Sequence, residues 1–321
     1  MRGKHKVIVQ NNKLHYEFEI KRNITIIQGD SATGKTTLID MITQVQNLGD
    51  SSGIELVCDV PCRTVSGADW KLILNNTHGN IIFLDEENYF INTKDFAEIV
   101  CKSDNYYVII TRENLYNLPY SVEEIYGLRS SGKYQNTNRI YQDFYNIYSL
   151  EQTIPVQPEM VVTEDSKSGY DFFSAVCKEN GKTCVSAEGK SNIFAKIKEK
   201  NEHEICVVAD GAAIGPEMNR LFEQCKKNSK LKLYLPESFE WIILKSGIVD
   251  GKTVEDILDH PEDFIDSEHF FSWERYFEKL LIDQTEGTYL QYKKAKLNDA
   301  YLHDRNKKAI LNTIGEGHLI I

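Results

Sequence analysis

The chain has 321 residues, a formal net charge of −11 and 41% hydrophobic residues, a length that favours two domains with a helical appendage over a single core. The negative charge excludes attraction of nucleic acid by the whole molecule, so a DNA or RNA partner would need a local patch. No apolar stretch reaches about 18 residues and the start resembles no signal peptide, so we expect a cytoplasmic protein that binds no membrane. The seven cysteines are scattered, which favours reduced thiols.

The first elements lead to a glycine-bounded loop. Period-two alternation over residues 6–10 and 14–20 predicts a β-hairpin, and the apolar run Ile24–Ile27 predicts a buried strand. Residues 29–36 then match G-x-x-x-x-G-K-[ST], and residues 38–42 continue as a helix. This order of strand, loop and helix is the context in which the motif binds nucleotide phosphates, whereas an ordinary glycine turn before a helix is the alternative.

The motif assigns a role to each part of the loop. Its glycines let backbone N–H groups point at phosphates, and the helix N-terminus adds its positive dipole end. Lys35 would reach the β- and γ-phosphates of ATP, and the Thr36 hydroxyl would bind Mg²⁺. The residues expected to contact the nucleotide are Gly29, Asp30, Ser31, Ala32, Thr33, Gly34, Lys35, Thr36 and Thr37.

An apolar run that ends in two acids supplies the second part of this site. Residues 81–84 predict a buried strand, and Asp85 and Glu86 follow it. Asp85 would hold Mg²⁺ through water, while Glu86 would orient and deprotonate the attacking water. Residues 106–110 predict another buried strand, which ends in Thr111 and Arg112. Strands alternating with helices in this way predict a parallel sheet covered on both faces.

With these motifs, residues 1–150 resemble the additional-strand, catalytic-glutamate division of the P-loop ATPases, and the hairpin resembles that of ABC-type ATPases. The resemblance implies ATP hydrolysis, with Thr111 as a polar sensor of the γ-phosphate. Arg112 would be a partner-facing charge or part of a surface ion pair. Residues 65–69 are at best a remnant of an ABC signature, so the ABC mode of dimerisation does not follow. No Asn-Lys-x-Asp motif occurs, which favours ATP over GTP.

A second α/β unit begins after a proline-containing linker at residues 153–158. Its predicted strands include residues 160–163, followed by Glu164, and 205–208, followed closely by Asp210. Acids after these strands resemble the TOPRIM domain, in which a glutamate and an Asp-x-Asp motif gather Mg²⁺ for phosphodiester chemistry. Only hard oxygen ligands suit that metal.

The match to the TOPRIM pattern is partial. Glu164 would correspond to its glutamate and Asp210 to its first aspartate, and the two would share one Mg²⁺. Ala212 stands where the second aspartate is expected. Glu237 and Glu240 would supply the missing carboxylate, or they are solvated residues at a strand edge.

The chain from about residue 253 is helical and charged. An aromatic stripe between Phe264 and Leu281 predicts core packing, with a homodimer contact as the alternative. Lys293 and Lys294 are interleaved with other charges, which favours an exposed helix face. The basic cluster at residues 226–232 would contact phosphates or form a solvated helix end.

We therefore expect an α/β protein with a P-loop ATPase domain at residues 1–152, a TOPRIM-like domain at 159–250 and a helical extension at 251–321. This pairing resembles the OLD-type ATPase-nucleases that act on foreign or damaged DNA. It implies an ATPase whose nucleotide state controls a Mg²⁺-dependent nucleic-acid site, with Lys35, Glu86, Glu164 and Asp210 as catalytic residues. The alternative is an ATP-dependent switch or binding module whose second domain performs no cleavage.

Overall fold

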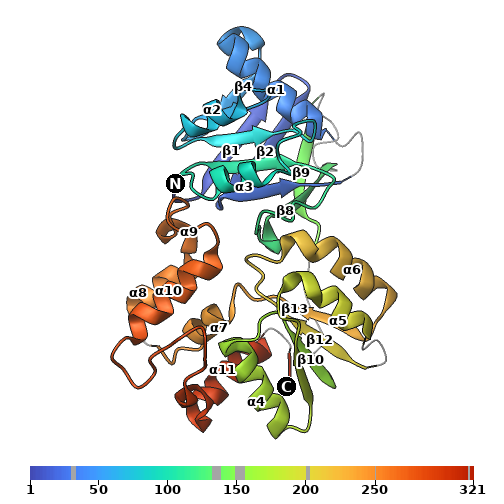
Figure 1. Ribbon diagram of the computed structural model, residues 1–321. Helices are drawn as coiled ribbons and strands as arrows, with labels where there is room; N and C mark the ends of the chain where they lie inside the picture. Colours follow the sequence, from blue (N-terminus) through green and yellow to red (C-terminus); the bar gives the residue numbers. More distant parts are fainter. Residues whose placement is uncertain (30–33, 132–138, 149–155, 200–202, 250, 317–318) are drawn as a thin grey trace. The chain divides into compact units, whose positions relative to one another are not determined.

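The computed structural model describes residues 1–29, 34–131, 139–148, 156–199, 203–249, 251–316 and 319–321. The chain forms two compact units (Figure 1). The first comprises Met1–Tyr148 with His260–Ser272, and the second comprises Ser149–Asp259 with Trp273–Ile321. The predicted α/β class is confirmed, because one unit contains a large mixed sheet and the other a separate parallel sheet.

The described part of the first unit contains a nine-stranded sheet. Its strands are β1 (His5–Gln10), β2 (Leu14–Ile20), β3 (Ile24–Ile27), β4 (Glu55–Val57), β5 (Cys62–Thr64), β6 (Ile81–Leu84), β7 (Tyr106–Ile110), β8 (Ile125–Ser130) and β9 (Ile140–Asn146). Their order is β4-β1-β2-β9-β8-β3-β7-β6-β5. The strands from β8 to β5 are parallel to one another, and β1 and β2 form the predicted antiparallel hairpin.

Helices cover both faces of this sheet. Successive side chains of β7 point to opposite faces, and all of them are buried. Val108 and Ile110 pack with Leu38 and Ile42 of α1 (Lys35–Leu48) in one hydrophobic core. Tyr107 points to the opposite face, where it meets the aromatic cluster of α2 (Trp70–Asn75) and α3 (Lys94–Val100). Both faces of β7 are therefore withdrawn from water, which explains its continuous apolar sequence.

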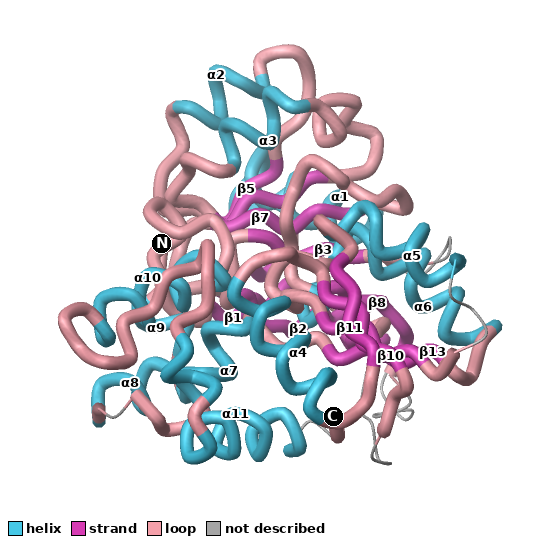
Figure 2. Tube along the Cα trace, turned by 60° about the horizontal axis from the view of Figure 1, so that its bottom comes forward, coloured by secondary structure: helices cyan, strands magenta, loops and turns pink. Residues whose placement is uncertain are grey.

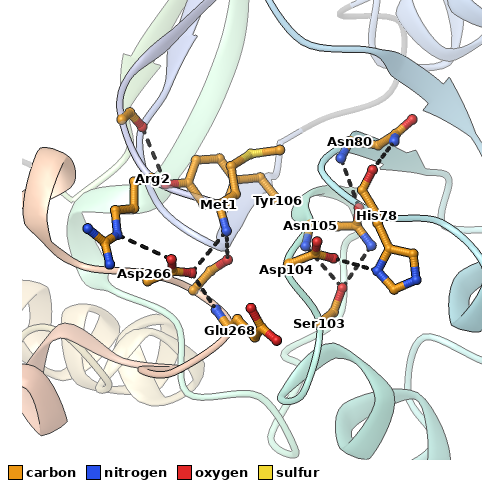
Figure 3. Close-up of polar contacts among 12 residues, drawn as sticks. Met1, Arg2, His78, Asn80, Ser103, Asp104, Asn105, Tyr106, Asp266 and Glu268 are labelled. Carbon is orange, nitrogen blue, oxygen red and sulfur yellow. Dashed lines mark hydrogen bonds and ion pairs between the residues drawn. The ribbon is translucent and has the colours of Figure 1, made fainter.

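A buried asparagine holds the starts of two central strands together. Asn105 Oδ1 accepts a hydrogen bond from the Asn80 N–H at 2.9 Å (Figure 3), and Asn105 Nδ2 donates to the Thr77 C=O at 2.6 Å. Since Asn80 precedes β6 and Asn105 precedes β7, these bonds fix the two strands at their amino ends. The residues that follow their carboxyl ends are thereby brought to a common edge.

The segment His260–Ser272, which contains α9 (Pro261–Phe264), belongs to the first unit. The Met1 ammonium group donates to Asp266 Oδ1 at 3.1 Å and to Ser267 Oγ at 3.0 Å (Figure 3). The division of the chain thus differs from the predicted one at its C-terminal end. The expected helical extension forms no unit of its own, because this segment packs on the first unit and the rest packs on the second.

The second unit is built on the parallel sheet β11-β10-β12-β13. Helix α4 packs against β10 and β11, while α5 and α6 lie on the other side of the sheet (Figure 2). None of the helices in the described ranges is both long and apolar enough to cross a membrane. The elements of this unit are β10 (Met160–Thr163), α4 (Ser168–Glu179), β11 (Thr183–Ser186), α5 (Ile193–Glu199), β12 (Ile205–Val208), α6 (Met218–Lys227), β13 (Leu231–Tyr234), α7 (Phe239–Lys245), α8 (Lys252–Asp259), α10 (Trp273–Thr285) and α11 (Asp304–Glu316).

A buried carboxyl group lies beside β3, the strand that precedes the predicted phosphate loop. Glu124 is completely buried, and its Oε1 lies 3.4 Å from Arg22 Nε. The Thr25 hydroxyl donates to Glu124 Oε2 at 3.3 Å. Burial raises the pKa of Glu124 to about 7, and the nearby Arg22 offsets only part of this rise.

We expect the raised pKa of Glu124 to make the first unit less stable as the pH rises. The stabilising contribution of the protonated group is fully present below the unfolded value of 4.5 and is lost as pH rises through about 7. Glu124→Gln should remove about 3 kcal/mol of this pH-dependent change in unfolding free energy. Urea unfolding of both proteins across this pH window measures the difference, and parallel pH dependences would contradict the assignment.

Candidate functional site

The predicted phosphate loop connects the end of β3 to the start of α1. Gly29 has φ 128° and Gly34 has φ 93°, backbone conformations that favour glycine. Because α1 begins at Lys35, the free N–H groups of its first turn adjoin this loop. The predicted contact residues Asp30, Ser31, Ala32 and Thr33 lie outside the described residues.

The side chain of Lys35 connects the two described ends of the loop. Its side chain is buried, and its Nζ donates to the Gly29 C=O at 2.8 Å. Thr36 is exposed in the first turn of α1, and Thr37 is half-buried. The ammonium group therefore lies against the backbone at the start of the loop, where an anion could compete for it.

Two side chains from the neighbouring strands β2 and β9, which pair in parallel, support the second glycine. The hydroxyl of Tyr16 on β2, a fully buried residue, donates to the Gly34 C=O at 2.9 Å. Gln142 on β9 lies opposite Tyr16 in the sheet. If residue 34 carried a Cβ atom, that atom would lie 3.4 Å from Gln142 Nε2. That Cβ would also lie 2.9 Å from the Tyr16 hydroxyl oxygen.

This support was missed in the sequence, where Tyr16 was one of several alternating residues of a hairpin. The available signal was general: a buried tyrosine hydroxyl needs a hydrogen-bond partner. Gln142 Oε1 is buried and has no hydrogen-bond partner among the described residues. The two side chains therefore restrict position 34 to glycine and fix its carbonyl group.

Asp85 and Glu86 follow β6 at the same edge of the sheet. The Glu86 N–H donates to Asp85 Oδ1 at 2.7 Å. Burial raises the pKa of Asp85, and the negative charges of Glu87, Glu86 and Asp40 raise it further. Since Asp40 belongs to α1, the acidic pair lies beside the helix that Lys35 begins.

The polar residues Thr111 and Arg112 follow β7, which lies between the strand of the loop, β3, and the strand of the acidic pair, β6. Thr111 is buried, and its hydroxyl accepts the Glu113 N–H at 3.0 Å and donates to the Glu113 C=O at 3.2 Å. The proposed γ-phosphate sensor is thus engaged within its own turn. Arg112 Nη2 lies 3.1 Å from Glu86 Oε1 in an exposed ion pair.

In the second unit, Glu164 and Asp210 are brought together as predicted. They follow the adjacent parallel strands β10 and β12, and the Asp210 N–H donates to Glu164 Oε2 at 3.1 Å. Burial raises the pKa of Glu164 to about 7 and that of Asp210 well above its usual value, and the charge of Glu274 adds to both rises. A small cavity of about 20 Å³ beside both carboxyl groups has room for about one water molecule.

Lys294 lies among the carboxylates of the second unit. Its Nζ is 2.9 Å from Glu240 Oε1, 3.8 Å from Glu274 Oε1 and 4.0 Å from Asp210 Oδ2. The residue lies in a turn between α10 and α11, and only 15% of its side chain is exposed. The prediction of an exposed helix face is therefore wrong for Lys294, because carboxylates from three separate segments surround its ammonium group.

Of the two acids considered as replacements for the missing aspartate, Glu240 enters this cluster. It is completely buried, and the Tyr292 hydroxyl donates to its Oε1 at 2.5 Å. Glu237 is half-buried, and its C=O accepts the Ala212 N–H at 3.3 Å. Ala212 is itself buried, so the position expected for an aspartate is apolar.

The described residues of the two candidate sites do not include a complete set of protein metal ligands. Within the ranges that the structure describes, no three or more His, Cys, Asp and Glu side chains are arranged to hold a metal ion. Mg²⁺ binding by Thr36 and Asp85, and by Glu164 and Asp210, stays a prediction.

Comparison with known proteins assigns no family to the chain. A scan against protein-family models found no match, and a search of curated proteins found no similar sequence.

The hydroxyl of Tyr16 provides a test of the loop. Tyr16→Phe keeps the buried ring but removes the bond to the Gly34 carbonyl, so we expect ATP affinity to fall about 2- to 10-fold. Tyr107→Phe is the matched control, because it removes a similar bond to Ser103 from another part of the same sheet. Calorimetric titration measures both affinities, and equal affinities in the two variants would show that Tyr16 does not position the loop.

Proposed function

We propose that the protein binds ATP at the loop of residues 29–37 and hydrolyses it. One observation carries this proposal: Gly29, Asp85 and Thr111 follow the carboxyl ends of three adjacent parallel strands. Ligands of open α/β sheets bind at this edge. The start of the loop, the Asp85–Glu86 pair and Thr111 therefore lie at the same edge of the sheet.

The described ends of the loop fit phosphate recognition. The amino end of α1 offers free N–H groups and a positive dipole end. Lys35 is already directed at the loop by its bond to the Gly29 C=O. On nucleotide binding, we propose that its ammonium group exchanges this neutral carbonyl for the more negative β- and γ-phosphate oxygens.

The donors at this edge also fit Mg²⁺, which prefers oxygen ligands. Thr36 offers a hydroxyl and Asp85 a carboxylate, and negative charges from Asp40, Glu86 and Glu87 surround Asp85. A cation is stabilised in such surroundings. Mg²⁺ bound with ATP would neutralise charge on the phosphoryl group during transfer.

Glu86 is the candidate for orienting the attacking water. It follows the same strand as Asp85, and the ion pair with Arg112 holds its carboxylate at the strand end. A carboxylate in this place accepts a hydrogen bond from water and withdraws its proton as the bond to phosphorus forms. We propose that Arg112 positions Glu86 for this role.

The strand order supports the resemblance to the additional-strand P-loop ATPases. β7 lies between β3 and β6 and separates the phosphate-loop strand from the strand of the acidic pair. The antiparallel hairpin of β1 and β2 in the same sheet supports the likeness to ABC-type ATPases. The lack of an Asn-Lys-x-Asp motif in the sequence favours ATP over GTP.

For the second unit we propose a binding role under control of the nucleotide state, with DNA, RNA or a protein as the partner. Its likeness to a TOPRIM domain rests on Glu164 and Asp210, which adjoin at one sheet edge. Ala212 and the contacts of Lys294 favour binding over Mg²⁺-dependent cleavage.

The first functional test removes the phosphate lysine. Lys35→Ala eliminates a charge-assisted contact, so we expect ATP affinity to fall roughly 10- to 100-fold. Lys13→Ala, which removes an exposed lysine from the same unit, is the control. Fluorescence titration with a labelled ATP analogue measures binding, and unchanged affinity in Lys35→Ala would overturn the assignment of the loop.

The second test separates hydrolysis from binding. Glu86→Gln keeps the size of the side chain but removes the base, so kcat should fall about 10²- to 10⁴-fold while ATP remains bound. Glu98→Gln changes an exposed acid of α3 and should leave kcat near the parental value. Phosphate release measures turnover, and an unchanged kcat in Glu86→Gln would place the base elsewhere.

A further inference from the structure

The acidic cluster of the second unit already contains a cation. The Lys294 ammonium group lies within 4.0 Å of carboxylate oxygens from Asp210, Glu240 and Glu274. Asp210 in turn donates its backbone N–H to Glu164. One positive charge is therefore shared by three carboxylates at the sheet edge where the TOPRIM resemblance implies Mg²⁺.

Both the backbone and the ammonium group of Lys294 are fixed by contacts within the unit. Its backbone C=O accepts the Ser168 N–H at 3.1 Å, which ties the turn to the start of α4. Its ammonium group pairs most closely with Glu240, which also accepts the Tyr292 hydroxyl. Tyr292 and Ser168 share a further hydrogen bond at 2.5 Å. The lysine is thus built into the packing of the unit.

The surrounding residues do not fit Mg²⁺. That ion needs oxygen ligands at about 2.0–2.1 Å in near-octahedral order. Within the described ranges no three His, Cys, Asp or Glu side chains are arranged to hold a metal ion, and the oxygens of this cluster instead lie 2.9 to 4.0 Å from the Lys294 nitrogen. Buried Ala212 supplies no ligand where the resemblance requires an aspartate.

We propose that Lys294 takes the place of the divalent cation, so that an internal ammonium group offsets part of the negative charge of these carboxylates and they bind no metal. Three carboxylates gathered without a cation would repel one another, and Lys294 reduces that cost without an external ligand. The second unit then keeps the arrangement of a metal site while its charge balance is independent of Mg²⁺.

A Mn²⁺ titration of the full chain without nucleotide tests this proposal, with electron paramagnetic resonance to count the bound ions. We expect wild type and Asp210→Asn to bind the same number of Mn²⁺ ions with the same affinity. One bound ion fewer in Asp210→Asn would overturn the proposal. Because no ATP is present, the result does not depend on whether the first unit hydrolyses ATP.

A charge cycle at Lys294 tests the same proposal through stability. Lys294→Met leaves the buried Glu240 carboxylate and the partly buried Asp210 and Glu274 carboxylates without their cation, so the melting temperature should fall by about 5 °C or more. Lys293→Met, its exposed neighbour, should change it little. Adding Asp210→Asn to Lys294→Met should recover part of the loss, and no recovery would contradict the shared charge balance. If Lys294→Met fails to fold, the Mn²⁺ titration decides alone.

Discussion

Burial of the central strands on both faces is the constraint on which both candidate sites depend. β3, β6, β7, β10 and β12 are buried along their whole lengths, and none carries a charged residue. A charged side chain in such a strand would lose its hydration without gaining a partner. Charged groups are therefore confined to the strand ends, and because neighbouring strands are parallel, those ends meet at one edge. The phosphate loop, the Asp85–Glu86 pair and the Glu164–Asp210 pair all occupy such edges.

This constraint also explains what the sequence could predict. A buried strand followed by an acid is a continuous apolar run with a polar end, so the strands before Gly29, Asp85, Glu164 and Asp210 were all predictable. The contacts of Tyr16 with Gly34 and of Lys294 with its carboxylates were not, because their partners are distant in sequence and carry no shared pattern. The amphipathic C-terminal helices reveal a buried face without revealing which unit covers it, so the assignment of His260–Ser272 to the first unit required the structure.

The two units use a buried lysine in different ways. One hydrogen bond of Lys35 goes to a backbone carbonyl, a neutral acceptor that a more negative phosphate oxygen can replace. Lys294 pairs with three carboxylates, so its displacement would leave the buried Glu240 and two partly buried acids uncompensated. The first arrangement suits a site that binds and releases a charged ligand. The second suits a fixed internal ion cluster, and this contrast supports our proposal that the nucleotide binds in the first unit.

The most direct measurement is a crystal structure of the full chain with Mg²⁺ and a non-hydrolysable ATP analogue. We expect the triphosphate to lie in the loop of residues 29–37 and Lys35 Nζ to have left the Gly29 carbonyl for the β- and γ-phosphates. We also expect the metal beside Thr36 and Asp85. An analogue bound away from this loop, or a loop that stays empty at saturating analogue concentration with Lys35 still on Gly29, would contradict ATP binding at residues 29–37.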